Sequence, residues 1–191
     1  MKQYDVLVVD PPWEVKKIHR DCRPNQVEMG YPMMSIDEIT RLPLPEICKE
    51  NSVCFLWTIQ KYIERSFSIL REWGFKYLLT LTWDKGNGLC LFGFHWRTEF
   101  VLVGYKGNLP MYPSQPTMPS LLNSSSGRNH STKPQVFYDY AETFGQDRID
   151  IFARRQRMGW DVYGNEVYSS VKLDVPPIMY DDPYKVHEQI R

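Results

Sequence analysis

An acid, two prolines and a tryptophan follow a short apolar run near the start of the chain, in the sequence VLVVDPPWEV at residues 6–15. An amino group attached to an aromatic base is a poor nucleophile, because its lone pair is delocalised into the ring. The carboxylate of Asp10 and a nearby backbone carbonyl can both accept its N–H bonds, which favours the pyramidal nitrogen that forms as the amine attacks an electrophile. Such acceptors must be fixed beforehand, and Pro11 and Pro12 each lock φ and offer no competing N–H. The ring of Trp13 can stack on the base.

The same residues have a simpler interpretation, since Asp and Pro are common in turns at strand ends. That interpretation does not account for the tryptophan. We do not expect Asp10 to act as a strong base, because a carboxylate has an unperturbed pKa near ~4. Its expected work is positioning and hydrogen bonding, with proton loss late in the reaction.

Five apolar runs have the length and composition of buried strands. They occupy residues 4–9, 52–58, 75–83, 100–105 and 148–153. The first is continuously apolar, as expected of a strand that is buried on both faces of a sheet.

Three helices are expected between these strands. Ser35 and Glu38 form a capping box that starts a helix, and Pro43 and Pro45 cut it short. The other two helices have apolar residues at helical spacing and end at a glycine, and they run to Gly74 and from Pro134 to Gly145.

Two long stretches, 14–30 and 107–132, lack periodicity and are expected to be loops. Strands otherwise alternate with helices, which predicts an α/β sandwich with a largely parallel sheet and helices on both faces. In such sheets ligands bind beyond the carboxyl ends of the strands. Asp10 stands at one of those ends.

The composition of the 191 residues fits one domain with a filled core, since 42% are hydrophobic. The formal net charge of zero argues against a general polyanion-coating protein. Four cysteines without a CxxC pattern indicate reduced thiols in a cytoplasmic protein, and no metal site or membrane segment is expected. We expect a catalytic domain at 1–168 and a peripheral tail at 169–191.

Further sequence blocks place the chain beside a known family. DPPW at residues 10–13 resembles the signature of the adenine N6-methyltransferases related to the catalytic subunit of the eukaryotic mRNA adenosine methyltransferase. The resemblance runs from about Tyr4 to Val167. Seven further blocks occur in the family's order: GYPMMSIDEI (30–39), CFLWT (54–58), WDKGN (83–87), EFVLVGYKGN (99–108), GRNHSTKPQVFY (127–138), IDIFAR (149–154) and WDVYGNE (160–166).

This resemblance implies a Rossmann-like methyltransferase fold that is circularly permuted, with the acceptor strand first and the cofactor strand late. It implies S-adenosylmethionine as the cofactor. The implied catalytic residues are Asp10, Pro11, Pro12 and Trp13. The implied cofactor-binding residues are Asp10, Pro12, Lys133, Phe152, Arg154, Asn165 and Glu166. Trp13 and Tyr31 are implied to contact the target adenine, and Lys133 the cofactor carboxylate.

Several of these residues also have ordinary interpretations. Lys133 could be a solvated lysine, and Glu99 could cap a strand or orient Lys133. Asn165 and Glu166 could form a plain turn, although a carboxylate can accept two ribose hydroxyls. Arg154 could pair with any surface acid. The segment His95, Trp96 and Arg97 could face nucleic acid or only decorate a loop.

Three functions remain open from the sequence. Methylation of adenine in DNA is favoured, because a compact, unfused chain resembles bacterial or phage family members. The same reaction on RNA is the alternative, and either substrate must offer an exposed base. A non-catalytic partner subunit is disfavoured because the acid and Trp13 are both present. A homodimer or a partner subunit could supply additional specificity.

Overall fold

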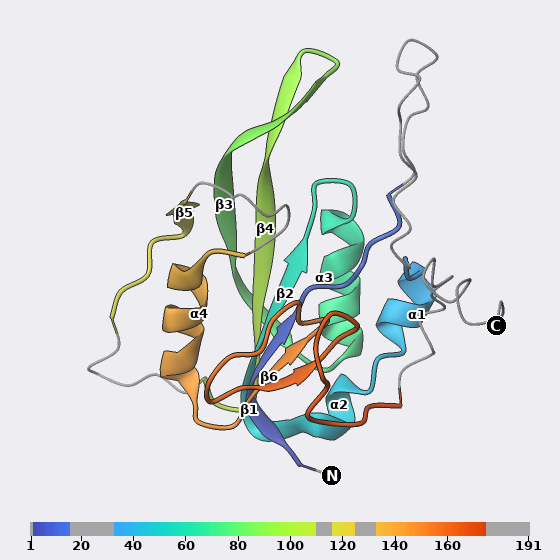
Figure 1. Ribbon diagram of the computed structural model, residues 1–191, viewed down its shortest axis with the longest axis vertical. Helices are drawn as coiled ribbons and strands as arrows, with labels where there is room; N and C mark the ends of the chain where they lie inside the picture. The colour runs from blue at the N-terminus through green and yellow to red at the C-terminus, as the bar shows by residue number, and fades with distance from the viewer. Residues whose placement is uncertain (1, 16–32, 110–115, 125–132, 175–191) are drawn as a thin grey trace, which may run out of the picture.

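A seven-stranded sheet lies between two groups of helices (Figure 1). The computed structural model describes residues 2–15, 33–109, 116–124 and 133–174. In chain order the elements are β1 (Tyr4–Val9), α1 (Ile36–Thr40), α2 (Leu44–Ile47), β2 (Cys48–Thr58), α3 (Ile63–Glu72), β3 (Lys76–Leu91), β4 (Phe94–Lys106), β5 (Leu121–Asn123), α4 (Gln135–Ala141), the 3₁₀ helix η1 (Glu142–Phe144), β6 (Arg148–Ile151) and β7 (Asp161–Tyr163).

The strand order is β5-β3-β4-β2-β1-β6-β7. β4 runs antiparallel to both of its neighbours, and the other four ladders are parallel. The expected largely parallel α/β sheet is therefore confirmed. β1 lies between β2 and β6, so the sheet extends from β1 on both sides: through β2 on one side and through β6 on the other. Asp10 follows the strand at which the sheet order switches, where open α/β sheets bind ligands.

The apolar run of β1 supplies both faces of the sheet. Leu7 and Val9 belong to the core under α1, α2 and α3, whereas Val6 and Val8 belong to the core under α4. All four side chains are fully buried. Side chains alternate between the faces of a strand, which explains why a strand covered by helices on both sides is apolar at every position.

The expected helix boundaries hold with one exception. The capping box of Ser35 and Glu38 is present at the start of α1. Gly74, with a positive φ of 84°, follows the end of α3 as expected. Pro45, expected to help end a helix, instead stands in the first turn of α2. A proline fits there because the first N–H groups of a helix have no intrahelical partner.

The antiparallel pair β3–β4 is much longer than the sequence predicted. The two strands continue to Leu91 and Phe94, which pair with each other. The expected strands 75–83 and 100–105 were too short because glycines and polar residues interrupt the apolar pattern between them. Part of the expected loop 107–132 is also a strand, since β5 pairs with β3 in parallel. The short strand β7 was likewise not expected.

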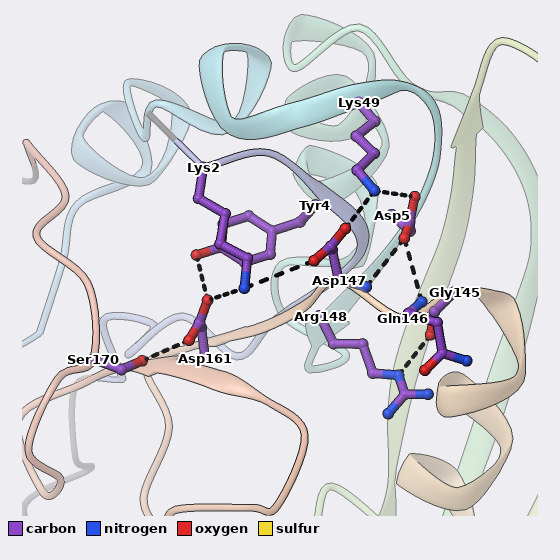
Figure 2. A network of polar contacts seen from close by, with 10 residues as sticks. All are labelled: Lys2, Tyr4, Asp5, Lys49, Gly145, Gln146, Asp147, Arg148, Asp161 and Ser170. Atoms are coloured by element: carbon purple, nitrogen blue, oxygen red, sulfur yellow. Dashed lines mark hydrogen bonds and ion pairs between the residues drawn. The ribbon is translucent and has the colours of Figure 1, made fainter.

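Charged residues at the amino ends of the parallel strands form a polar network (Figure 2). Lys2 Nζ lies 2.9 Å from Asp161 Oδ2. Lys49 Nζ lies 2.9 Å from Asp5 Oδ1 and 2.5 Å from Asp147 Oδ2. We call these five residues the amino-edge network. It ties the start of the chain and β2 to β6 and β7.

The described part of the expected tail packs against the sheet domain. The backbone N–H of Ser170 donates to the Val162 carbonyl at 2.9 Å, and Val171 and Leu173 pack against the core under α3. The boundary expected at residue 168 remains a prediction. Within the described residues, no helix has the length and apolar character needed to cross a membrane.

Candidate active site

Asp10 stands directly beyond the carboxyl end of β1. Its backbone N–H donates to the carbonyl of Ile151 at 3.2 Å, which fixes it beside the end of β6. Its side chain is 17% exposed, and its Oδ2 lies 2.9 Å from Lys133 Nζ. The structure thus brings together a strand-end acid and a lysine that are distant in the sequence.

Lys133 bridges two carboxylates. Its Nζ also donates to Glu99 Oε2 at 3.0 Å, and Lys85 Nζ donates to Glu99 Oε1 at 3.1 Å. We call these four residues, Asp10, Lys133, Glu99 and Lys85, the carboxyl-edge cluster. Glu99 therefore contacts Lys133 rather than only capping a strand, and Lys85 is a member that the sequence did not reveal.

Burial sets the electrostatics of this cluster. Burial raises the pKa of Asp10, although Lys133 opposes the shift. Burial acts to raise the pKa of Glu99, but Lys133 and Lys85 together hold it below its ordinary value. Burial acts to lower the pKa of Lys133, but its two carboxylates hold it above its ordinary value. The two carboxylates therefore favour the charged form of Lys133, and Asp10, whose pKa is raised, is more readily protonated than Glu99, whose pKa is lowered.

The two prolines after Asp10 are held by backbone hydrogen bonds. The Pro11 carbonyl accepts from the Trp13 N–H at 2.8 Å, and the Pro12 carbonyl accepts from the Met34 N–H at 2.9 Å. Each carbonyl oxygen has two lone pairs, and within the described residues one backbone N–H donates to each. The loop is thus fixed in the manner expected from its sequence.

Trp13 is more deeply built into the fold than its expected role as a stacking platform requires. Its side chain is 7% exposed, and its indole N–H donates to the Trp57 carbonyl at 3.1 Å. One face stacks on Tyr62, with ring centroids 5.1 Å apart and planes 18° apart. Trp13 therefore anchors the two prolines, and its contact with a base remains a prediction. No sequence signal pointed to Tyr62.

The residues that follow β6 and β7 lie on another side of the site, near Asp10. We call this part of the site, from Phe152 to Arg154 and from Gly164 to Glu166, the second wall. Phe152 has a positive φ of 69°, which is unusual for an aromatic residue and often marks a functional site. The N–H groups of Phe152 and Ala153 both donate to the Tyr163 carbonyl, at 2.6 and 3.0 Å. A Cβ on Gly164 would lie 2.2 Å from the Ala153 carbonyl oxygen, so only glycine permits this approach.

The turn after β7 carries two of the expected cofactor residues. Asn165 and Glu166 are exposed in this turn. Glu166 Oε1 lies 3.7 Å from Arg154 Nη1, and both side chains are close to half exposed. These groups are accessible from solvent, and their role in cofactor binding remains a prediction. Tyr31 lies outside the described residues.

A buried acid that the sequence analysis did not single out lies behind the cluster. Asp150 of β6 is 3% exposed, and its Oδ2 accepts a hydrogen bond from the Tyr138 hydroxyl at 3.0 Å. Burial raises the pKa of Asp150 to about 7, against the effect of the Tyr138 hydrogen bond. The signal was present in RIDIFA, where an acid interrupts an apolar strand.

Comparison with known proteins adds independent information. A model of the MT-A70 protein family matches residues 4–166. The type II methyltransferase M.MunI of Mycoplasma sp is 30% identical, over 92% of this chain and 82% of that protein. The Homo sapiens N(6)-adenine-specific methyltransferase METTL4 is 26% identical over 91% of this chain. The Homo sapiens N(6)-adenosine-methyltransferase catalytic subunit METTL3 is 27% identical over 90% of it. The chain spans 39% and 30% of these two human proteins.

Proposed function

This chain belongs to the MT-A70 family, and on that premise we propose that it transfers a methyl group to the exocyclic N6 amino group of adenine in DNA. The observation that carries the proposal is the position of Asp10. It is an acceptor fixed at the switch point of the sheet, next to the buried cation of Lys133.

The chemistry follows from the acceptors around the amine. As the adenine nitrogen attacks, its N–H groups would donate to the Asp10 carboxylate and to a proline carbonyl. The positive charge that develops on the nitrogen is stabilised because these acceptors are already in place. After the bond has formed, the nitrogen loses a proton, and the raised pKa of Asp10 suits this carboxylate to receive it.

We propose S-adenosylmethionine as the cofactor, which when bound would supply an electrophilic methyl group whose bond to sulfur breaks, with the electron pair left on a neutral thioether. Lys133 offers a cation for its carboxylate, and the Trp57 ring lies 4.8 Å from Lys133 Nζ. The buried indole N–H of Trp57 has no hydrogen-bond partner among the described residues. A buried donor without a partner is costly, so this indole is a second candidate donor for a ligand. The donors present thus fit an anionic group.

The remaining cofactor contacts are proposed on the second wall. Glu166 and Asn165 would hold the ribose hydroxyls, since a carboxylate accepts two hydrogen bonds. Arg154 would hold the Glu166 side chain in place, and Phe152 and Pro12 would flank the cofactor. Tyr31 is proposed to cover the target base, while Trp13 supports the prolines that form the floor of its pocket.

DNA is favoured over RNA by the pattern of similarity. The match to the type II methyltransferase covers 82% of that protein, whereas the match to the adenosine methyltransferase METTL3 covers 30% of it. Either substrate must present its adenine outside a base stack. We also propose a reducing cytoplasmic setting, because Cys48, Cys54 and Cys90 are free thiols. We also propose that a second copy of the chain or a partner subunit contributes to specificity.

A methyl-transfer assay tests the proposed function. Tritiated S-adenosylmethionine is offered with duplex DNA, single-stranded DNA and RNA of one sequence, and the product is identified as N6-methyladenine by mass spectrometry. The matched control replaces every adenine with purine, which lacks the amino group. We expect incorporation into DNA that the purine control abolishes. Transfer to RNA alone would replace the DNA assignment, and no transfer to any substrate would favour a non-catalytic subunit.

A further inference from the structure

Lys85 is the member of the carboxyl-edge cluster that the proposed reaction does not use. It lies on β3, and its Nζ donates to Glu99 Oε1 at 3.1 Å. The other oxygen of Glu99 accepts from Lys133 Nζ at 3.0 Å, and Lys133 Nζ also lies 2.9 Å from Asp10 Oδ2. The four side chains thus form a row of alternating charge that begins at Lys85 and ends at Asp10.

Exposure to solvent decreases from Lys85 towards Lys133. The side chain of Lys85 is 24% exposed, that of Glu99 is 14% exposed and that of Lys133 is 7% exposed. Ion pairs at an exposed surface are worth little because water screens them, but buried and partly buried pairs are screened much less. A change of charge at Lys85 is therefore felt at Lys133 through Glu99.

The backbone of β3 is irregular at the point where it carries Lys85. Its pairing with β4 shifts register between Asp84 and Leu89. Gly86 has a positive φ of 73°, and its N–H donates to Asp84 Oδ1 at 2.9 Å. Irregularities of this kind re-aim side chains and are frequent beside active sites. The contact between Lys85 and Glu99 thus belongs to a defined local structure, and Lys85 is not an ordinary solvated lysine of a regular strand.

Without Lys85 the cluster would carry excess negative charge. Asp10 and Glu99 supply two carboxylates, whereas Lys133 supplies one ammonium group. Arg154 also acts on Asp10, but its side chain is 40% exposed, so water screens its charge. With Lys85 present, two ammonium groups match the two carboxylates. This balance matters to an anionic ligand, because a site with net negative charge would repel it.

The effect of Lys85 is exerted on Glu99. Lys133 and Lys85 together hold the pKa of Glu99 below its ordinary value, against the effect of burial. Asp10 lies beyond Lys133, and the charge of Glu99 acts to raise its pKa. If Lys85 were removed, Lys133 would be the one remaining cation beside Glu99 in the described chain, and its ammonium group would be drawn more strongly to Glu99.

We propose that Lys85 is a positioning residue: by sharing Glu99 with Lys133, it leaves the Lys133 ammonium group available to the carboxylate of the cofactor. A lysine ammonium has three donors, of which Glu99 and Asp10 take two in this structure. Lys85 acts through Glu99 and needs no contact with the ligand. This inference rests on the proposed function, because it takes the cofactor carboxylate as the ligand of Lys133.

A double-mutant cycle on ligand affinity tests the proposal. The variants are Lys85→Gln, Glu99→Gln and the combination of both, with Lys85→Arg as the conservative change and Lys49→Gln of the amino-edge network as the matched control. Isothermal titration calorimetry on the full chain measures two compounds. S-adenosylhomocysteine carries the carboxylate of the cofactor and transfers no methyl group, whereas 5′-methylthioadenosine shares its nucleoside but lacks the amino-acid part.

The expected result is a loss that depends on both the carboxylate and Glu99. Lys85→Gln should weaken S-adenosylhomocysteine binding at least about threefold, within the range of coupling between members of one charge network. It should leave 5′-methylthioadenosine binding unchanged, because that compound has no carboxylate. In the Glu99→Gln background the same change should have no effect, since the charge that Lys85 balances is gone. Lys85→Arg and Lys49→Gln should bind both compounds as the wild type does.

A second measurement reads the charge of Glu99 without any ligand. The pKa of Glu99 is followed by NMR titration of protein that carries carbon-13 in the side-chain carboxyl of glutamate, and the resonance is assigned from its absence in Glu99→Gln. Loss of an adjacent cation disfavours an ionised carboxylate. Lys85→Gln should therefore raise the pKa of Glu99, and Lys49→Gln should not move it.

Several results would overturn the proposal. Unchanged S-adenosylhomocysteine affinity in Lys85→Gln would do so, as would an equal loss for both compounds, which indicates a general effect on the fold. The same loss in the Glu99→Gln background would mean that Lys85 acts by direct contact. If the wild type binds neither compound, the proposed cofactor is wrong, and the pKa of Glu99 still decides: a rise in Lys85→Gln supports the control of Glu99 by Lys85, and an unchanged value overturns it.

Discussion

Lys133 and Lys49 each bridge two carboxylates, at opposite edges of the same sheet. Lys133 lies 2.9 Å from Asp10 and 3.0 Å from Glu99. Lys49 lies 2.9 Å from Asp5 and 2.5 Å from Asp147 (Figure 2). The side chain of Lys133 is 7% exposed and that of Lys49 is 35% exposed. The two arrangements have the same charges and differ in burial.

Burial gives the two edges different consequences. Exposed ion pairs contribute little to stability because water screens them. At the amino edge, the hydrogen bond from Lys49 lowers the pKa of Asp147. At the carboxyl edge, burial raises the pKa of Asp10 even though Lys133 is adjacent. Charges removed from water are costly even when paired, so the carboxyl-edge cluster is better explained by chemistry than by stability.

The largest expected effect is on turnover. Asp10→Ala should reduce methyl transfer by at least about a hundredfold, because a preorganised acceptor is lost. Asp147→Ala at the amino edge should stay within about twofold of the wild type. The tritium assay measures both, and circular dichroism checks that each variant is folded. Near-wild-type turnover in folded Asp10→Ala would remove the catalytic assignment.

The second comparison concerns stability. Lys133→Met should lower the free energy of unfolding by about 3–5 kcal/mol, because it leaves the buried Asp10 without its adjacent cation and Glu99 with Lys85 alone. Lys49→Met should cost less than about 1 kcal/mol, because its partners remain hydrated. Urea unfolding measures both. Adding Glu99→Gln to Lys133→Met should restore part of the loss, and equal losses in the two single variants would refute the contrast.

The pH dependence of the free energy of unfolding distinguishes the buried Asp150 from the more exposed acids of the amino-edge network, because the two kinds of acid change stability in opposite directions as the pH rises. Asp150 has a folded pKa of about 7 against an ordinary 3.8, so the folded state binds a proton more tightly and stability falls as pH rises through 7. Between pH 5 and pH 8 this loss amounts to about 2–3 kcal/mol. The Asp150→Asn variant should not show this loss of stability between pH 5 and pH 8.

The amino-edge acids should respond at a different pH. Asp147 and Asp161 have lowered pKa values, so their contribution is present above pH 3.8 and is lost only as the pH falls below that value. Urea unfolding at each pH measures the effect. An unchanged slope between pH 5 and pH 8 in Asp150→Asn would show that the buried acid does not titrate there.

The smallest expected effect is on cofactor affinity. Lys133→Ala should weaken S-adenosylmethionine binding about tenfold or more, because a hydrogen bond to a charged group contributes roughly 1.5–3 kcal/mol. Asn165→Ala should weaken it about two- to tenfold, because a neutral hydrogen bond contributes roughly 0.5–1.5 kcal/mol. Lys49→Met should bind the cofactor as the wild type does. Isothermal titration calorimetry measures the three. Unchanged affinity in both Asn165→Ala and Lys133→Ala would argue against this cofactor site.

Local patterns predicted much of the fold. The apolar run before Asp10, the capping box of Ser35 and the stop at Gly74 each depend on a few neighbouring residues, and each was read correctly. The extension of β3 and β4 was missed because pairing between strands, rather than apolar composition, holds the outer part of these two strands together. β5 was missed for the same reason, since three residues acquire strand structure only from a neighbour.

The sequence by itself determined the types of residue at the site: an acid stiffened by two prolines, a lysine before a helix and a turn beyond a late strand. These follow from backbone restrictions that act within a few residues. Only the tertiary structure decided that Lys133 meets Glu99, 34 residues away, and that Trp13 is buried against Tyr62. Burial and distance depend on which elements pack together, and no local pattern encodes that.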